Sequence, residues 1–186
     1  MLGMSKSPHE GASSRIVSRA GIWVSLGVLT RIAKHLLIGP MQVINLPLLF
    51  TMLAGCLDGA SMGLIVGFLS FLASDAFLGI GLWTLVDGLI AGLAGSIMGI
   101  LGRVSLGWGM AFLLSYILTL AYDILTSWIL YMAFGLAPLH SLIMGIIGLF
   151  LPTGGGSVFM IGPVTEISTA LSFSLLVVEL RRRSLD

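Results

Sequence analysis

Two long stretches of the chain, residues 35–102 and 104–180, contain no lysine or arginine. Charged residues make up only 9% of the 186 residues, whereas a soluble domain needs about a quarter. A chain this poor in charge is expected to lie in a lipid bilayer. The hydrocarbon core is about 30 Å thick and takes about 20 helical residues per crossing. The segment 19–183 is long enough for six crossings, so we predict an all-α membrane protein built as a six-helix transmembrane bundle.

The basic residues predict how this bundle is oriented. Lys6, Arg15 and Arg19 precede the first apolar run, Arg103 interrupts the middle of the chain, and three arginines at 181–183 follow the last run. Cytoplasmic segments of membrane proteins carry an excess of lysine and arginine. Both termini are therefore expected in the cytoplasm, which requires an even number of crossings.

These anchors divide the chain into three parts. We expect a polar cytoplasmic N-terminal tail over residues 1–18, a six-helix membrane domain over 19–183 and a cytoplasmic C-terminal end over 184–186. The tail is rich in serine and glycine and has no apolar core, and basic residues rather than a cleavage site follow the first apolar run. That run is interpreted as a retained membrane span and not as a signal peptide.

Prolines and glycines mark the ends of the predicted helices. The expected spans in chain order are about 20–38, 47–57, 60–75, 83–101, 106–134 and 161–179, with a tight inner turn at Asp58-Gly59 between the second and the third. Residues 140–151 are apolar but too few to cross a bilayer, so they are expected to form an outer half-span before the last helix. The alternative is a seventh crossing, which would place the arginines at 181–183 outside the cell.

Small residues recur at a spacing of four. In lipid there is no hydrophobic drive between helices, so small side chains that let backbones touch supply the contact. This predicts helix-packing ridges at glycines 55, 59, 63 and 67, at 88 and 92, and at 95 and 99. Gly21 and Ser25 form another such pair, which could face a partner membrane protein.

Acidic residues within the predicted spans point to a polar site, because a carboxylate in the bilayer is costly and normally faces a cavity or a counter-charge. Asp87, Asp123 and Glu166 are expected at a similar level in the outer half of the bundle. Aromatic residues fall at the same depth: Trp83, Tyr122, Trp128 and Tyr131. The pattern predicts an outward-facing polar pocket with aromatic walls, and its carboxylates favour a cationic or amine-bearing ligand.

Ion pairing is the alternative explanation for these carboxylates. Arg31 and Lys34 lie in the outer half of the first helix and could neutralise two of them. The tryptophans and tyrosines could equally form an interfacial belt.

Catalytic and cofactor functions are not indicated. The chain has no phosphate-binding loop, no nucleophile elbow and no second aspartate motif beside Tyr122-Asp123. A single cysteine, Cys56, excludes an internal disulfide and a thiolate metal site, and His35 and His140 lack ligand spacing. No metal, cofactor or nucleic-acid partner is expected, and we predict that the protein is not an enzyme.

The middle of the chain resembles the substrate-binding S components of energy-coupling factor (ECF) transporters. The residues that carry the resemblance are Leu46-Pro47, Gly55, Gly59, Gly63, Gly67, Ser74-Asp75, Trp83-Thr84-Leu85-Val86-Asp87-Gly88, Gly92 and Gly95. Six helices with short second and third spans also match, and the resemblance covers residues 20–182. The apolar stretch 138–151 and the glycines 154–156 depart from the pattern.

The resemblance implies a non-catalytic subunit in a prokaryotic cell membrane that binds a vitamin or similar micronutrient near the outer face. Its partners would be a membrane coupling subunit and two cytoplasmic ATPases, with Gly21 and Ser25 at the docking face. Loops 39–46, 76–82 and 152–160 would cover the substrate. The candidate substrate-binding residues are Asn45, Asp75, Trp83, Asp87, Tyr122, Asp123, Trp128 and Glu166.

Two other functions stay open. A free-standing proton-coupled carrier could use Asp87, Asp123 or Glu166 as a proton relay, although the chain shows no clear internal repeat of the kind common in such carriers. A structural or assembly protein would have all of its acidic residues ion-paired.

Overall fold

The computed structural model describes residues 8–39, 41–103, 106–151 and 161–183, and within these ranges all regular elements are helices. They are α1 (Pro8–Ile38), α2 (Leu46–Asp58), α3 (Ala60–Leu78), α4 (Leu82–Leu101), α5 (Trp108–Ala133), α6 (Pro138–Gly148) and α7 (Ile161–Arg183). Helices α1, α3, α4, α5 and α7 are long and apolar enough to cross a membrane, and α2 and α6 are shorter apolar helices. The predicted all-α membrane bundle is confirmed.

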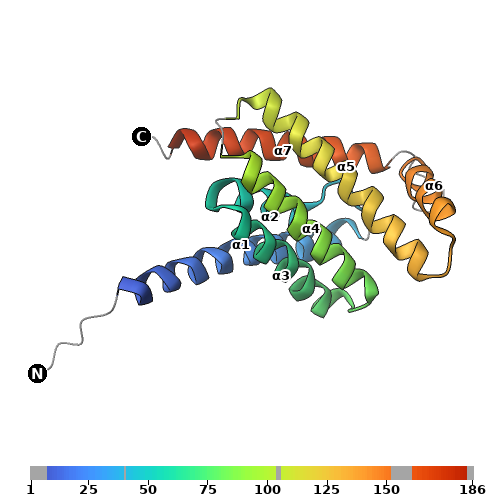
Figure 1. Cartoon of the computed structure of the whole chain (residues 1–186), viewed down its shortest axis with the longest axis horizontal. Coiled ribbons are helices and arrows are strands. Elements are labelled where there is room, and N and C mark those ends of the chain that lie inside the picture. The colour runs from blue at the N-terminus through green and yellow to red at the C-terminus, as the bar shows by residue number, and fades with distance from the viewer. Residues whose placement is uncertain (1–7, 40, 104–105, 152–160, 184–186) are drawn as a thin grey trace, which may run out of the picture.

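Helix α2 lies at the centre of the bundle. It contacts α1, α3, α4 and α7, and nine of its thirteen residues are buried. The other main helix pairs in contact are α3 with α4, α5 with α7, α1 with α3, α5 with α6, and α4 with α5 (Figure 1). Thirteen helical residues extend only about 20 Å, so α2 is a short, mostly protein-covered helix among longer ones.

One end of the bundle gathers the expected basic anchors, and we call it the anchor end. Arg19 of α1 forms an ion pair with Asp58 at the end of α2, and Arg181 of α7 donates to the backbone carbonyl of Gly102, directly before Arg103. The described ends of α1 and α7 next to the two termini lie on this same side of the molecule, opposite α6 (Figure 1). Helices that start and finish at one end are what an even number of crossings requires.

The backbones of α2, α3 and α4 touch through glycines. Gly63 of α3 lies against Gly95 of α4, and Gly67 against Gly92. A methyl group on Gly95 would lie 2.9 Å from the carbonyl oxygen of Gly63, which is closer than real side chains approach. Gly55 of α2 also faces Gly95, so one glycine of α4 accommodates both neighbouring helices. The predicted packing ridges at these positions are confirmed.

Gly59 has a different role from the other glycines of its series. It is the single residue between α2 and α3, with φ at 101°, a left-handed conformation that favours glycine. Its N–H donates to the Gly55 carbonyl at 2.9 Å and closes α2. The expected tight turn at Asp58-Gly59 is present, and the turn, not helix packing, accounts for this glycine.

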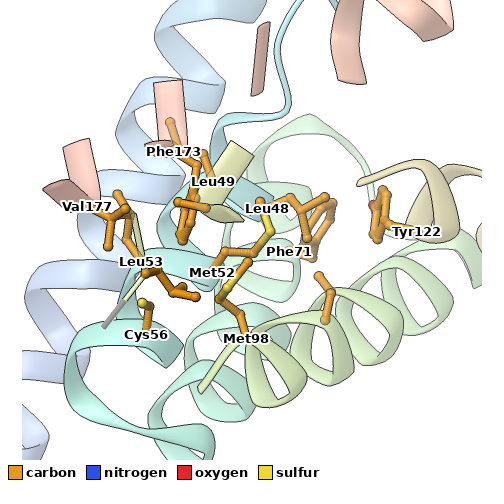
Figure 2. Close-up of a cluster of buried hydrophobic side chains, with 14 residues drawn as sticks. Leu48, Leu49, Met52, Leu53, Cys56, Phe71, Met98, Tyr122, Phe173 and Val177 are labelled. Carbon is orange, nitrogen blue, oxygen red and sulfur yellow. The ribbon is translucent and has the colours of Figure 1, made fainter. Parts of the chain in front are cut away.

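An apolar core fills the space between α2 and its neighbours (Figure 2). Leu48, Met52 and Leu53 of α2 are at most 1% exposed. Around them pack Phe71 of α3, Met98 of α4, Tyr122 of α5, and Phe173 and Val177 of α7. This core joins the α1–α4 group to α5 and α7.

Several helices extend beyond the predicted spans. Helix α1 begins at Pro8 and not near residue 20, so part of the expected polar tail is helical, and α7 continues through Arg183 and not to about 179. Helix α3 reaches Leu78, three residues past the expected end. Hydropathy predicts only the residues that lie within the bilayer, so it underestimates the length of these helices. A helix can continue into water while its side chains are solvated or paired, and Arg183 is paired with Glu179 at 2.7 Å.

Helix α6 accounts for the expected half-span. Its eleven residues extend only about 16 Å, too short to cross a bilayer. It packs against α5, and the Trp128 indole N–H donates to the Pro138 carbonyl at 2.9 Å. The expected lid segment 152–160, with its triple glycine, lies outside the described residues.

The glycine contacts predict a position-specific loss of stability. Gly95→Val adds bulk against the Gly63 backbone and should lower the free energy of unfolding by about 1–3 kcal/mol, the usual cost of overpacking. Gly21→Val is the matched control, because Gly21 is exposed and its added Cβ would meet nothing within 4 Å. Thermal unfolding in detergent measures both, and equal melting temperatures for the two variants would contradict the packing assignment.

Candidate ligand site at the cavity end

Three cavities open at the end of the bundle opposite the anchor end, and we call this the cavity end. We name each after one lining residue: the Asp123 cavity of about 220 Å³, the Asn45 cavity of about 40 Å³ and the Asp75 cavity of about 230 Å³. Gln42 lines all three. The cavities therefore form a connected polar region around the segment between α1 and α2.

The Asp123 cavity lies between α5, α6 and α7. Its polar lining consists of Gln42, Asp123, Thr126, Ser127, Tyr131 and Thr165. Four of these come from α5 at positions i, i+3, i+4 and i+8, which fall on one face of a helix. Asp123 and Tyr131 were predicted from the sequence, whereas Thr126 and Ser127 were not. Their spacing of three and four residues from Asp123 places them on the same helix face and could have indicated them.

Helix α7 fixes the segment 41–45 through hydroxyl groups. Thr165 donates to the carbonyl of Gln42, and Ser168 to the carbonyl of Val43. Thr169 accepts from the N–H of Asn45 at 3.0 Å. These bonds satisfy a non-helical backbone within the bundle, where an unpaired peptide group is costly. They also place Gln42 at the junction of the cavities, a position that hydropathy could not reveal.

Asn45 is the polar centre of the Asn45 cavity. It is 2% exposed and caps α2, where its Oδ1 accepts from the N–H of Leu48 at 3.2 Å. Its Nδ2 has no hydrogen-bond partner among the described residues. Asp87 and Tyr122 line the same cavity. An unused donor thus lies beside a carboxylate and a phenol.

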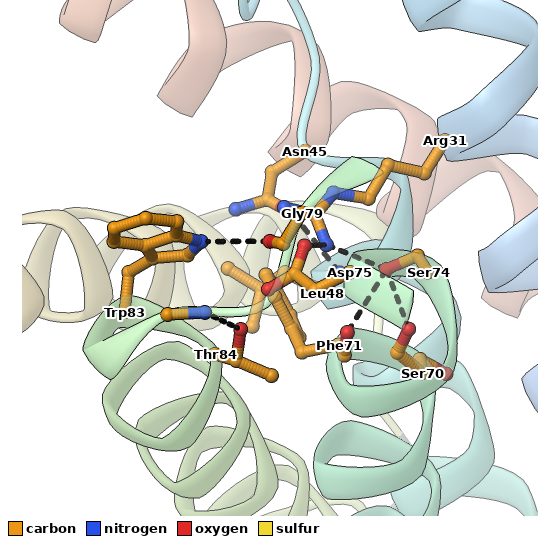
Figure 3. A network of polar contacts seen from close by, with 11 residues as sticks. Arg31, Asn45, Leu48, Ser70, Phe71, Ser74, Asp75, Gly79, Trp83 and Thr84 are labelled. Carbon is orange, nitrogen blue, oxygen red and sulfur yellow. Dashed lines mark hydrogen bonds and ion pairs between the residues drawn. The ribbon is translucent and has the colours of Figure 1, made fainter. Parts of the chain in front are cut away.

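An ion pair forms one wall of the Asp75 cavity (Figure 3). Arg31 contacts the Asp75 carboxylate at 2.7 Å and donates to the hydroxyl of Ser74. Its guanidinium also lies 4.8 Å from the centre of the Phe71 ring. Asp75 is 1% exposed, and its second oxygen, Oδ2, lacks a hydrogen-bond partner in the part of the chain that the structure describes.

The ion pair bears on the alternative that Arg31 and Lys34 neutralise carboxylates of the predicted pocket. Arg31 pairs with Asp75, and across the described ranges no salt bridge joins Arg31 or Lys34 to Asp87, Asp123 or Glu166. The Lys34 ammonium donates to the carbonyl of Met41 at 3.0 Å. The alternative in which Arg31 and Lys34 neutralise two of the three carboxylates is therefore not supported by ion-pair contacts among the described residues.

The common level expected for these three carboxylates stays a prediction, whereas the structure gives their charged neighbours. The charged neighbours of Asp123 are Glu166 and Asp87, and those of Asp87 are Arg31 and Asp75. Glu166 is 1% exposed beside Tyr116, and its Oε1 has no hydrogen-bond partner among described residues. Contact of any of these groups with a ligand stays a prediction.

The aromatic residues do not surround one pocket. Trp83 lines the Asp75 cavity, Tyr122 the Asn45 cavity and Tyr131 the Asp123 cavity. Trp128 is not among the described residues that line these three cavities, and its indole instead joins α5 to α6. The aromatic wall expected at one depth is distributed over the whole cavity end.

The two docking candidates lie on the face of α1 that the bundle leaves uncovered. Gly21 and Ser25 are both exposed, and only 6% of the apolar window of α1 is buried. Among the described residues no group of three His, Cys, Asp or Glu side chains could hold a metal ion.

No protein-family model, curated protein or solved structure matches this chain. The function is therefore inferred from the residues and their geometry.

The ion pair at the cavity end predicts a difference between two Asp→Asn variants. Asp75→Asn leaves the largely buried Arg31 without its counter-charge and should lower the free energy of unfolding by about 2–3 kcal/mol. Asp123→Asn makes the same chemical change where no ion pair is present and should leave the melting temperature nearly unchanged. Thermal unfolding in detergent measures both variants. Equal destabilisation would show that Asp75 and Asp123 have the same structural role.

Proposed function

We propose that this protein is the membrane-embedded, non-catalytic substrate-binding subunit of an ATP-driven importer for a vitamin-type micronutrient, of the ECF S-component kind. The observation that carries the proposal is the connected set of polar cavities at one end of a compact helical bundle. Ligand sites are concave, and a small number of positioned polar groups fixes the ligand within them. Here those groups come from five helices, α1, α3, α4, α5 and α7, and from the segment 41–45.

The distribution of charge supports an outward-facing site. The arginines at 19, 103 and 181 mark the anchor end, which the positive-inside rule assigns to the cytoplasm. The cavities lie at the opposite end. In the proposed orientation both termini are cytoplasmic, and the cavities face the outside of a prokaryotic cell, where an imported substrate is captured.

The uncovered face of α1 supports docking to a partner in the membrane. Gly21 and Ser25 lie one turn apart there, and small residues let two helix backbones approach closely. The proposed partner is a membrane coupling subunit driven by two cytoplasmic ATPases, with the lipid bilayer around the remaining surface.

A proton-coupled carrier is the second candidate, and the unpartnered carboxylate oxygen of buried Glu166 favours it. The two candidates differ in their need for a motor. A carrier would accumulate substrate in proteoliposomes driven by a pH gradient alone, whereas the proposed subunit would bind substrate but require the coupling complex and ATP for uptake.

The orientation can be tested by cysteine labelling on a Cys56→Ala background. A membrane-impermeant maleimide applied to intact cells should label Ile80→Cys, which is an exposed position in the α3–α4 connection at the cavity end. Ser184→Cys, next to the arginines that follow the last apolar run, should react only after the cells are permeabilised. Labelling of position 184 from outside would place the C-terminus there and reverse the topology.

The docking face can be tested by adding bulk. Gly21→Leu and Ser25→Leu should each abolish co-purification with the coupling complex while the isolated subunit keeps its ligand affinity, because leucine prevents close helix approach. Ala33→Leu adds comparable bulk at another exposed position of α1 and serves as the control. Unchanged assembly in both test variants would place the docking face elsewhere.

A further inference from the structure

We infer that the substrate is an organic cation with net positive charge, and that its charged nitrogen binds at Asp123. This inference rests on the proposed function and specifies the substrate class of the same site. It follows from three features: which charges are already paired, which hydrogen-bonding atoms are unused, and how the cavity is shaped.

The charges at the cavity end do not balance. Four carboxyl groups lie there, on Asp75, Asp87, Asp123 and Glu166, and the basic residues in the described lining of the same cavities are Arg31, Lys34 and His35. Arg31 is already paired with Asp75 (Figure 3). The ion pair leaves three carboxyl groups beside one ammonium group and one imidazole, so acidic groups outnumber basic groups in the remaining region.

The excess is concentrated at Asp123. Its cavity has no lysine, arginine or histidine in its described lining, and its charged neighbours, Glu166 and Asp87, are both acidic. Within the described ranges Asp123 forms no salt bridge. A carboxylate in a membrane protein normally faces a counter-charge. A bound cation would supply it, whereas an anionic ligand would add to the repulsion.

Unused polar atoms beside the carboxylates point to a ligand independently of the charges. Asn45 is 2% exposed and lines the Asn45 cavity, where its side chain lies toward the Tyr122 phenol but its Nδ2 makes no hydrogen bond of normal geometry among the residues described. A buried donor without a partner costs about 1–3 kcal/mol. The ligand is therefore expected to present an acceptor to Asn45 and its cationic nitrogen to Asp123, with Gln42 between them.

The shape of the Asp123 cavity favours an organic cation over a bare metal ion. Its volume of about 220 Å³ has room for several water molecules. Gly148 lines it and leaves space where a side chain would lie, since the nearest atom to an added Cβ is the Tyr131 hydroxyl oxygen at 3.9 Å, so a ring or a methylated nitrogen can pack there. The described residues offer no three-ligand metal group.

The test uses the purified full-length protein in detergent and a small-molecule extract of rich growth medium. Ion exchange at pH 7 separates the extract into cationic, neutral and anionic fractions, and each fraction is titrated while the melting temperature is recorded. The cationic fraction should raise the melting temperature of the wild type. The Asp123→Asn variant should need at least tenfold more of that fraction to reach half of the maximal rise in melting temperature.

Asp58→Asn is the matched control, because it removes the same charge at the anchor end and should leave the half-saturating amount unchanged. Stabilisation by only the neutral or anionic fraction would overturn the cationic substrate while leaving the proposed function intact. An Asp123→Asn variant as sensitive as the wild type to the cationic fraction would overturn the assignment of Asp123. If no fraction stabilises the wild type, the proposed binding function itself is wrong, and the inference fails with it.

Discussion

The direct backbone contact between α2, α3 and α4 is the constraint on which the rest of the structure depends. Helix α2 is short and mostly buried, so it cannot hold its position through lipid contact and needs close neighbours. Glycines at 55, 63 and 95 provide them by letting the three backbones touch. As a result Asn45 at the start of α2, Asp75 near the end of α3 and Asp87 near the start of α4 belong to one rigid unit.

The site forms where this rigid unit meets α5, α6 and α7. The apolar core around Met52 and Phe173 fills the space between α2 and its neighbours. The three polar cavities lie at the cavity end, and a more apolar cavity lies beside Arg19 and Asp58 at the anchor end. The segment 41–45 lies between the two groups, held by the hydroxyls of α7. One structural ion pair, Arg31 with Asp75, lies in this region, while Asp123 faces an open polar cavity. The ion-paired carboxylate of Asp75 and the cavity-lining carboxylate of Asp123 thus belong to different cavities.

The sequence predicted the features that depend on periodicity and composition. These were the membrane bundle, the glycine ridges and the Asp58-Gly59 turn. It did not predict the partner of Arg31 or the role of Gln42, because both depend on side-chain packing between distant segments. Trp128 shows the same limit, since the direction of its indole, toward α6, depends on a helix–helix contact.

Native mass spectrometry of the purified protein tests the central claim, that the cavity end holds a small molecule, most directly. The wild type should carry one bound molecule after gentle purification. Gly148→Phe should release it, because Gly148 lines the Asp123 cavity and the nearest atom to an added Cβ is the Tyr131 hydroxyl oxygen at 3.9 Å, so the new ring can fill the cavity without a backbone clash. A wild-type protein with only its bare mass, or a Gly148→Phe variant that retains the same molecule, would contradict the account.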